Sequence, residues 1–256
     1  MPFAAAPDGA RIYYERHGAG PAILFVHGSG GHHAAWWQQV TALRDRYTVV
    51  TVDLRGFGRS DSSMPEFDGQ DFPGDLIAVL DAEDLRDVLL VGQSIGSVAA
   101  LRAALQRPDR VAGVALGHSL GGLDHPELSE LVAADRAEAV KLPVIDRLMS
   151  RKFQAEQPAK TFLFQQMGTF NVAKMADLRN LSTGGPTIEE IVASGVQLWF
   201  LAGETDAVLS VATVKRAHEL VKGSHLAIVP GAPHSMYWES PDLYNAAVAE
   251  IREALA

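Results

Sequence analysis

This chain of 256 residues contains a serine, an aspartate and a histidine whose positions in the sequence favour nucleophilic catalysis. Ser94 lies in the pattern Gly92-Gln93-Ser94-Ile95-Gly96, directly after the apolar run Val88–Val91, and Asp206 and His234 each follow a late apolar segment. A serine hydroxyl is a weak nucleophile unless a base accepts its proton, and histidine suits this task because it exchanges protons near neutral pH. An aspartate on the other ring nitrogen fixes the tautomer of that base. The three residues therefore indicate attack by an activated serine.

The residues around Ser94 predict a sharp turn between a buried strand and a helix. Glycines at positions 92 and 96 remove side chains where the backbone must close tightly, which leaves the serine hydroxyl free to stand clear of the turn. After the turn, Val98, Leu101 and Leu105 share one face of a helical pattern, and Pro108 ends that pattern.

A second copy of the pattern, Gly117-His118-Ser119-Leu120-Gly121, also follows an apolar strand. What comes next separates the two copies, because a glycine, an aspartate and a proline soon interrupt the chain after Ser119. We therefore predict that Ser94 is the nucleophile and that His118 or Ser119 lines the pocket.

Apolar segments alternate with helical patterns along most of the chain. This alternation predicts an α/β fold, with a mostly parallel central sheet and helices on both faces. Functional sites in such sheets form at the carboxyl ends of the strands, where the loops that begin at His27, Asp53, Ser94, Asp206 and His234 leave. Strands are expected at 10–18 (after a hairpin turn at 8–9), 22–26, 48–54, 88–91, 111–116, 196–201 and 226–229, and helices near 36–43, 71–84, 98–108 and 211–221 and at the C-terminal end.

Residues 120–186 break this alternation. They show helical patches but no convincing strand, and they carry several phenylalanines and methionines. We expect this segment to form a helical cap (lid) over the carboxyl edge of the sheet, inserted into a core domain that comprises residues 1–119 and 187–256.

The composition is that of one large globular domain, with 47% hydrophobic and 21% charged residues. The net charge of 22 − 31 = −9 argues against nucleic acid as a partner. The chain has no cysteine, which excludes disulfides, thiolate metal sites and a cysteine nucleophile. The N-terminus lacks the pattern of a signal peptide, and no segment approaches the roughly 18 apolar residues that span a bilayer. We therefore expect a cytoplasmic protein that is not attached to a membrane.

Five motifs together resemble those of α/β-hydrolase-fold enzymes, in particular serine esterases, lactonases and haloperoxidase-like members. The resemblance covers nearly the whole chain outside the cap and implies the order nucleophile, acid, histidine. It also places Ser119 at the entry to the cap. Besides the Ser94 pattern, the motifs are His27-Gly28-Ser29-Gly30, Asp53-Leu54-Arg55-Gly56-Phe57-Gly58-Arg59-Ser60, Leu201-Ala202-Gly203-Glu204-Thr205-Asp206 and Gly231-Ala232-Pro233-His234.

Asp206 and His234 are the candidate acid and base. Asp206 could also merely cap the helix that follows, but its place one strand before the histidine favours the catalytic role, with Glu204 as the nearest substitute. No other late histidine follows a strand as directly as His234 does.

A developing oxyanion needs N–H donors, which the backbone supplies without a side chain. We assign these donors to the amides of Ile95 and Ser29, with Gly30 as the nearby alternative. Tryptophans and phenylalanines more often belong to a core than to a substrate pocket, and this applies here to the tryptophan pair at 36–37 and to the phenylalanines of the cap. The candidate substrate contacts are His27, Gly28, Gly30, Trp36, Phe162 and His118.

No cofactor or metal is expected. His27, His32 and His33 match no familiar ligand spacing, and His27 is more simply explained as a brace for its own loop. The glycine run 28–31 lacks the third glycine and the acidic partner of a dinucleotide fingerprint. Asp53, with Arg55 and Ser60 of the same motif, is expected to form a structural turn.

The expected activity is hydrolysis of a carboxylic ester or a lactone, a small acyl compound, by a monomer or homodimer. A serine at position 94 argues against epoxide hydrolases and dehalogenases, whose family members carry an aspartate there. Carbon–carbon bond hydrolases, cofactor-free haloperoxidases or perhydrolases and hydroxynitrile lyases share the same triad and stay open as alternatives, as does a non-catalytic signalling protein. Ser97 and Pro233 depart from the glycines that are frequent at those positions.

Overall fold

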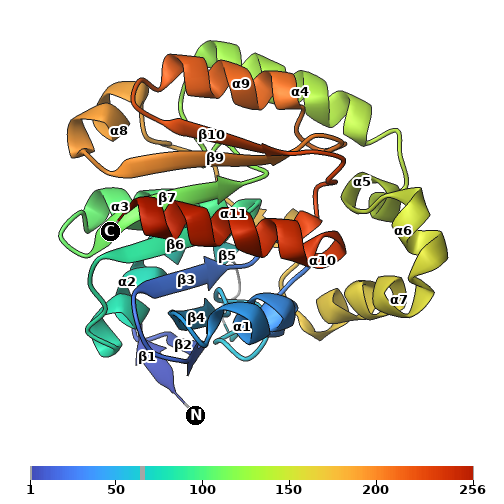
Figure 1. Cartoon of the computed structure of the whole chain (residues 1–256). Coiled ribbons are helices and arrows are strands. Elements are labelled where there is room, and N and C mark those ends of the chain that lie inside the picture. The colour runs from blue at the N-terminus through green and yellow to red at the C-terminus, as the bar shows by residue number, and fades with distance from the viewer. Residues whose placement is uncertain (1, 64–66, 256) are drawn as a thin grey trace.

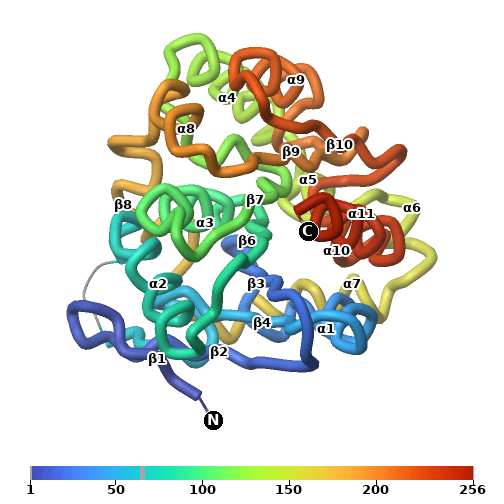
Figure 2. The backbone as a smooth tube through the Cα atoms, turned by 60° about the vertical axis from the view of Figure 1, so that its left-hand side comes forward, coloured from blue at the N-terminus to red at the C-terminus, as the bar shows by residue number. Residues whose placement is uncertain are grey.

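The computed structural model describes residues 2–63 and 67–255. Its centre is a sheet of eight strands that runs through the molecule from the N-terminal strands to the last strand of the chain (Figures 1 and 2). The α/β fold expected from the sequence is confirmed. In spatial order the strands are β1 (Phe3–Ala5), β2 (Arg11–His17), β4 (Thr48–Val52), β3 (Ala22–Val26), β6 (Val88–Gln93), β7 (Val111–Gly117), β9 (Gln197–Gly203) and β10 (His225–Val229).

The sheet is parallel except at its N-terminal edge. There, β1 and β2 form the expected hairpin, and β2 pairs antiparallel with β4. From β4 to β10 every neighbouring pair is parallel. Every residue of β3, β4 and β6 is buried, which explains why these strands are rich in valine, leucine and isoleucine and show no alternation of apolar and charged residues.

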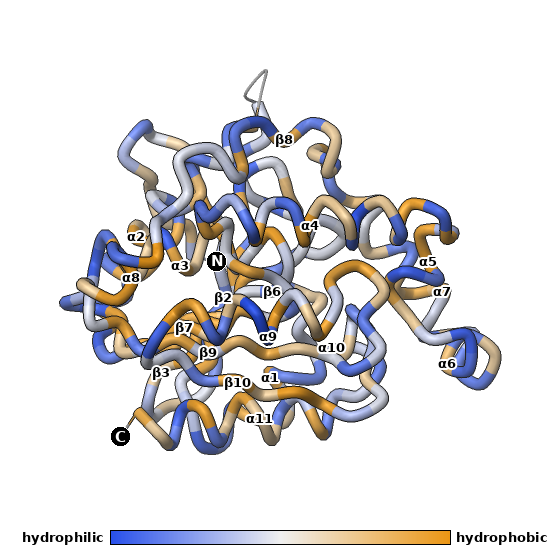
Figure 3. The backbone as a smooth tube through the Cα atoms, turned by 90° about the horizontal axis from the view of Figure 1, so that it is seen from above, coloured by the Kyte–Doolittle hydropathy of each residue, from blue (hydrophilic) through white to orange (hydrophobic). Residues whose placement is uncertain are grey.

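Helices cover both faces of the sheet and bury a separate hydrophobic cluster on each side. In the view of Figure 3, α11 lies on one side of β7 and β9, and α2 and α3 lie on the other. One face carries η1 (His33–Trp36), α1 (Trp37–Leu43), α10 (Met236–Glu239) and α11 (Pro241–Ala254), and the other carries α2 (Phe72–Ala82), α3 (Ile95–Gln106), α8 (Ile188–Ser194) and α9 (Val211–Leu220).

The segment 120–186 is helical, as expected, but it also holds one short strand. β8 (Leu178–Arg179) pairs parallel with β5 (Phe67–Asp68), so the expectation of no strand is wrong at this point. A strand of two residues is too short to produce a periodic pattern, which is why the sequence did not reveal it. The other elements are α4 (Pro126–Ala139), α5 (Val144–Leu148), α6 (Arg151–Glu156), α7 (Pro158–Met167), η2 (Gly168–Phe170) and η3 (Met175–Asp177).

The two ends of this segment meet at the rim of the sheet. The amide of Asp124 donates to the carbonyl of Pro186 at 2.9 Å, and a Cβ on Gly185 would lie 1.8 Å from the carbonyl oxygen of Gly122. Between these ends, α5, α6 and α7 lie on the side to which the arrowheads of β3 and β7 point (Figure 1). The chain thus leaves the sheet after β7, passes over its carboxyl edge and returns to α8.

Hydrogen bonds from the side chains of Ser60 and Arg55 stabilise the turn that contains Asp53. Ser60 Oγ donates to the carbonyl oxygen of Asp53 at 2.6 Å. The buried guanidinium of Arg55 donates to the carboxylates of Asp75 on α2 and of Asp8 in the hairpin turn. This motif therefore ties the N-terminal hairpin to the sheet and to α2.

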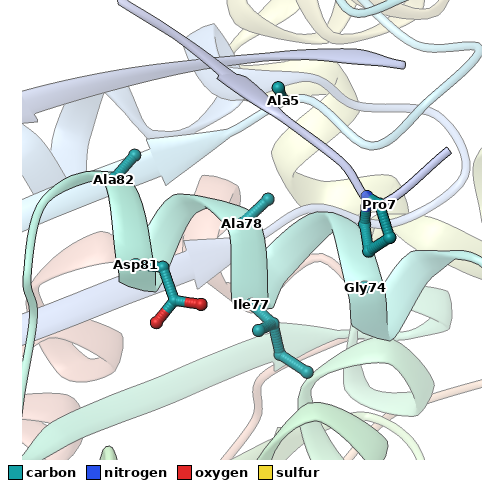
Figure 4. Close-up of a pocket in the computed structure, with 7 residues that line it drawn as sticks. All are labelled: Ala5, Pro7, Gly74, Ile77, Ala78, Asp81 and Ala82. Carbon is teal, nitrogen blue, oxygen red and sulfur yellow. The ribbon is translucent and has the colours of Figure 1, made fainter. Parts of the chain in front are cut away.

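A shallow groove of about 320 Å³ lies between β1 and α2 (Figure 4). Asp81 supplies the only ionisable side chain of its lining, and this carboxylate already accepts hydrogen bonds from Arg107. The described residues of the lining include no serine or histidine, so we place the candidate site elsewhere. Over the described ranges, no helix combines the length and the hydropathy that crossing a bilayer requires.

Candidate active site

Ser94 occupies a strained turn between β6 and α3. Its φ of +52° and ψ of −114° lie in a region that residues with a side chain rarely adopt. The amide of Ser94 donates to the carbonyl of Gly117 on the neighbouring strand at 2.8 Å, which holds the turn against the sheet. Backbone strain of this kind persists only where the surrounding structure imposes it, and it is concentrated at functional sites.

The glycines on either side of Ser94 are required by close contacts. A Cβ on Gly92 would lie 2.4 Å from the backbone nitrogen of Ser97, and a Cβ on Gly96 would lie 2.3 Å from the carbonyl oxygen of Val26. Ser97, whose role the sequence left open, donates its hydroxyl to the carbonyl of Gly92 at 2.9 Å. The side chain of Ser97 therefore links the start of α3 to the end of β6 across the turn.

The second glycine–serine pattern folds differently. His118, not Ser119, has the positive φ of this copy, at +54°. The hydroxyl of Ser119 accepts a hydrogen bond from the amide of Gly121 at 3.1 Å, and the next helix begins only at Pro126. Ser119 thus belongs to a local turn without the strand-to-helix geometry of Ser94.

Asp206 and His234 are brought together at the same edge of the sheet, after β9 and β10. Nδ1 of His234 lies 3.0 Å and 3.1 Å from the two carboxylate oxygens of Asp206, and both side chains are buried. Oδ1 of Asp206 also accepts from the amides of Val208 and Leu209. Burial by itself would raise the pKa of Asp206, but the facing His234 and His118 rings and their hydrogen bonds hold this pKa well below its usual range.

A side chain that the sequence analysis missed links the serine turn to the histidine loop. Gln93, the residue before Ser94, donates its amide to the backbone carbonyl of His234 at 2.9 Å. Gln93 stands at a variable position of the motif, so the sequence carried no signal for this contact. Beyond His234, Ser235 donates its amide to the carbonyl of Leu148, which fixes the histidine loop to α5.

The glycine-rich loop after β3 lies beside Ser94. A Cβ on Gly28 would lie 3.5 Å from the Cβ of Ser94, so this loop passes close to the serine side chain. A bond of 3.0 Å from the Gly31 amide to the Gly28 carbonyl closes the loop into a turn with Ser29 at its tip. Asn171 of the 120–186 segment donates to the carbonyl of Gly31 at 3.0 Å and holds the turn from outside.

Three of the candidate substrate contacts have buried side chains that already contact other parts of the protein. His27 is buried, its Nδ1 bonds the carbonyl of Gly28 and its Nε2 accepts from the amide of Leu54, so both ring nitrogens brace the backbone. Trp36 is 0% exposed and packs in the core against the ring of Phe25. The side chain of His118 is likewise 0% exposed, and its Nδ1 lies 2.8 Å from Oδ2 of Asp206.

The other candidate contacts stay predictions. Gly28 lies beside Ser94, as described above, and Gly30 is exposed in the same loop. Phe162, on α7, is 63% exposed and thus belongs to the surface rather than to the core.

Among the residues that the structure describes, two sets of side chains could in principle hold a metal ion, namely His32 with His33 and Asp53, and His118 with Asp206 and His234. In the first set, Nδ1 of His33 bonds the carboxylate of Asp53 at 2.8 Å, and Nδ1 of His32 accepts from a backbone amide. In the second set, both histidines direct Nδ1 at the carboxylate. Ligand atoms in each set are therefore already engaged with the protein.

The burial of His27 leads to a prediction about stability. Burial lowers the pKa of His27 from 6.5 to about 4, so between these values the unfolded chain binds a proton that the folded chain does not. The free energy of unfolding therefore falls as the pH falls through this window, by about 3 kcal/mol from this residue, and is insensitive to it above pH 6.5. We expect His27→Gln to show a smaller loss of stability than the wild type between pH 7 and pH 4.5 in urea unfolding.

The control for this measurement is Leu54→Ala, which removes a buried side chain but no titratable group. It should lower stability by a similar amount at both pH values and keep the wild-type pH dependence. An unchanged pH dependence in His27→Gln would contradict the prediction.

Comparisons with known proteins bear on the fold. The profile of the alpha/beta hydrolase family matches residues 23–247. A Synechocystis sp. protein with the provisional name non-heme chloroperoxidase is 28% identical over 260 residues, which cover 91% of this chain and 92% of that protein.

Solved structures show the same architecture over the full length. An esterase from Thermogutta terrifontis superimposes with a TM-score of 0.83 at 23% identity and covers 99% of this chain and 98% of its own. Est816, described as an N-acyl homoserine lactone degrading enzyme, superimposes with a TM-score of 0.77 at 23% identity and covers 97% of this chain and 99% of its own.

The sheet order and the strand-to-helix turn at Ser94 define the architecture of an α/β hydrolase. With the profile match over most of its length, the chain belongs to the alpha/beta hydrolase family.

Proposed function

We propose that this chain is a serine hydrolase that cleaves a carboxylic ester or a lactone through an acyl-enzyme, without a cofactor. Ser94 is the nucleophile, His234 the general base and Asp206 the acid that orients it. The observations that carry the proposal are the bonded pair of His234 and Asp206 and a serine held at positive φ in a strand-to-helix turn. Gln93 supports it, because its amide ties the backbone of His234 to the residue next to Ser94.

In the first half of the reaction, Ser94 Oγ attacks the carbonyl carbon while Nε2 of His234 accepts the hydroxyl proton. The carbonyl double bond opens and its oxygen becomes an oxyanion. When the carbonyl reforms, the bond to the leaving oxygen breaks, and His234 gives its proton to that oxygen. For an ester the alcohol departs, and for a lactone the hydroxyl stays on the acyl chain.

In the second half of the reaction, a water molecule replaces the serine as the nucleophile. His234 accepts a proton from the water as its oxygen attacks the acyl carbon, and it returns that proton to Ser94 Oγ as the ester bond to the enzyme breaks. The products are a carboxylic acid and the free serine. Asp206 remains ionised throughout and stabilises the imidazolium of His234, in keeping with its lowered pKa.

Backbone amides of two different elements are proposed to bind the oxyanion. Ile95 is the first residue of α3, where helical amides lack an intrahelical partner. Ser29 is at the tip of the loop that passes beside Ser94. Donors of this kind stabilise charge that develops only in the transition state, and the loss of one typically costs about 10²–10³-fold in rate.

A small acyl compound is the proposed substrate class. The structural relatives named above are described as an esterase and as an N-acyl homoserine lactone degrading enzyme, which supports both esters and lactones as test substrates. A serine at the nucleophile position supports an acyl-enzyme rather than the alkyl-enzyme that an aspartate would form.

Labelling with a fluorophosphonate probe tests this proposal, since the probe reacts with an activated serine. After digestion, we expect the label on the peptide that contains Ser94, and turnover of short p-nitrophenyl esters or lactones by the same preparation. Ser119→Ala serves as the control and should be labelled like the wild type. A label on Ser119, or an unlabelled protein that leaves all the esters and lactones intact, would refute the proposal.

A further inference from the structure

The carboxylate of Asp206 has two histidine partners rather than one. Its Oδ2 lies 2.8 Å from Nδ1 of His118 and 3.0 Å from Nδ1 of His234. The two rings meet edge to face, with their centroids 5.2 Å apart. His118 comes from the end of β7 and His234 from the loop after β10, so the aspartate joins two different parts of the sheet.

His118 has no route to a substrate. Its side chain is 0% exposed, and its Nε2 is buried without a hydrogen-bond partner among the described residues. Burial lowers the pKa of His118, which keeps the ring neutral. Because an ionised carboxylate only accepts hydrogen bonds, the single ring proton must lie on Nδ1 and point at Asp206. The ring therefore acts as a fixed donor.

The backbone at His118 is strained in a way that serves this contact. Its φ is +54°, and its amide donates to the carbonyl of Leu201 on β9 at 2.9 Å. Only glycine adopts such a φ freely, while asparagine tolerates it better than most residues. With this backbone conformation the ring is buried and its Nδ1 lies 2.8 Å from Oδ2 of Asp206.

We propose that His118 is a positioning residue that fixes the Asp206 carboxylate and weakens its hold on His234. The inference rests on the function proposed above, in which Asp206 orients the base. A carboxylate that already accepts a bond from His118 interacts less strongly with a protonated His234 ring. His118 therefore limits how strongly the Asp206 carboxylate holds the charged form of the His234 ring.

The groups around this pair are few. His118 and His234 are the titratable side chains that act on Asp206, and Asp206 and His234 are those that act on His118. The remaining partners of the carboxylate are the uncharged amides of Val208 and Leu209. A change at His118 can thus reach His234 through Asp206, which both rings contact, and through the direct contact between the two rings.

Two variants at position 118 test the hydrogen-bond donor of the side chain without changing the backbone conformation of the turn. His118→Asn keeps an N–H donor near the position of Nδ1, whereas His118→Gly lacks a side chain, and both residues accept a positive φ. For His118→Gly we expect kcat/KM on a p-nitrophenyl ester to fall roughly tenfold to a hundredfold, the size of one lost hydrogen bond to a charged group. The acid limb of its pH profile should also move to higher pH, while His118→Asn stays close to the wild type in both respects.

Proton NMR detects the hydrogen bonds from His118 and His234 to Asp206 directly, so this test does not depend on enzymatic activity. The wild type should show two downfield imidazole N–H resonances, one for each histidine bonded to Asp206, and folded His118→Asn should retain only that of His234. This measurement stands even if His118→Gly does not fold.

Two results would overturn the inference. One is a single downfield resonance in the wild type, and the other is a folded His118→Gly with the wild-type pH profile and rate. If Ser94→Ala is inactive in the same assay, either result rejects the role of His118 alone. Full activity in Ser94→Ala would instead reject the proposed function.

Discussion

Ser94→Gly is expected to abolish ester hydrolysis and, at the same time, to make the protein more stable than Ser94→Ala. The loss of the nucleophile should lower kcat by roughly 10⁵-fold or more. The gain in stability arises because Ser94 sits at a φ of +52°, which glycine adopts without strain and alanine does not. Relief of about 1–3 kcal/mol of strain, less about 0.5–1 kcal/mol for the freer unfolded glycine, leaves a net gain of about 1 kcal/mol.

Thermal unfolding of the two variants measures this difference. For a domain of this size, a gain of about 1 kcal/mol raises Tm by about 2–4 °C. Ser94→Ala controls for the lost hydroxyl, since it is equally inactive but keeps a Cβ at the strained position. Equal Tm values for the two variants would contradict the expected net gain, because the strain at Ser94 would then be no larger than the entropic cost of glycine, about 0.5–1 kcal/mol.

Asp206→Asn is expected to lower kcat by about 10⁴-fold while the fold is retained. The amide that replaces the carboxylate can donate to Nδ1 of His234, which stabilises the wrong tautomer, and it no longer stabilises the imidazolium. The variant also leaves His118 facing a neutral group at the other side of the site. Steady-state kinetics on a p-nitrophenyl ester, with circular dichroism as a check of folding, measures the effect.

Glu204→Gln is the matched control for this experiment. Glu204 lies two residues before Asp206 and was the alternative acid in the sequence, but the structure directs its carboxylate to the amide of Gly231 at 2.8 Å. It should therefore keep kcat within a few-fold of the wild type. A loss in Glu204→Gln as large as that in Asp206→Asn would mean that the acid is wrongly assigned.

Much of the fold could be predicted because the strands are buried on both faces. A strand such as β3 has to be apolar at every position, so its bounds, Ala22–Val26, are visible in the sequence without any alternation. The turn at Ser94 was predictable for a related reason, since its two glycines occupy places where a Cβ would strike the backbone. The two-residue pairing of β8 with β5 lacks any such signature.

The site was harder to predict where side chains that were expected to face the pocket point into the protein instead. His118 appeared to line the pocket because it follows a strand, but a positive φ turns its ring inward to Asp206, and nothing in the sequence marks a histidine for this conformation. Trp36 adjoins the motif loop in the chain, yet the short helix after the loop carries its ring into the core against Tyr237. Proximity in sequence therefore gave the neighbourhood of the site but not the direction of each side chain.

The closed ends of the 120–186 segment bear on how this protein can diversify. Because Asp124 and Pro186 are joined by a hydrogen bond, the segment leaves and re-enters the domain at one point. The entropic cost of closing such an excursion grows only slowly, by about 0.6 kcal/mol for each doubling of its length. Insertions and deletions inside it leave untouched the strand pairing that brings Ser94, Asp206 and His234 to one edge. The segment can thus change in length and sequence while the strand pairing of the core stays the same.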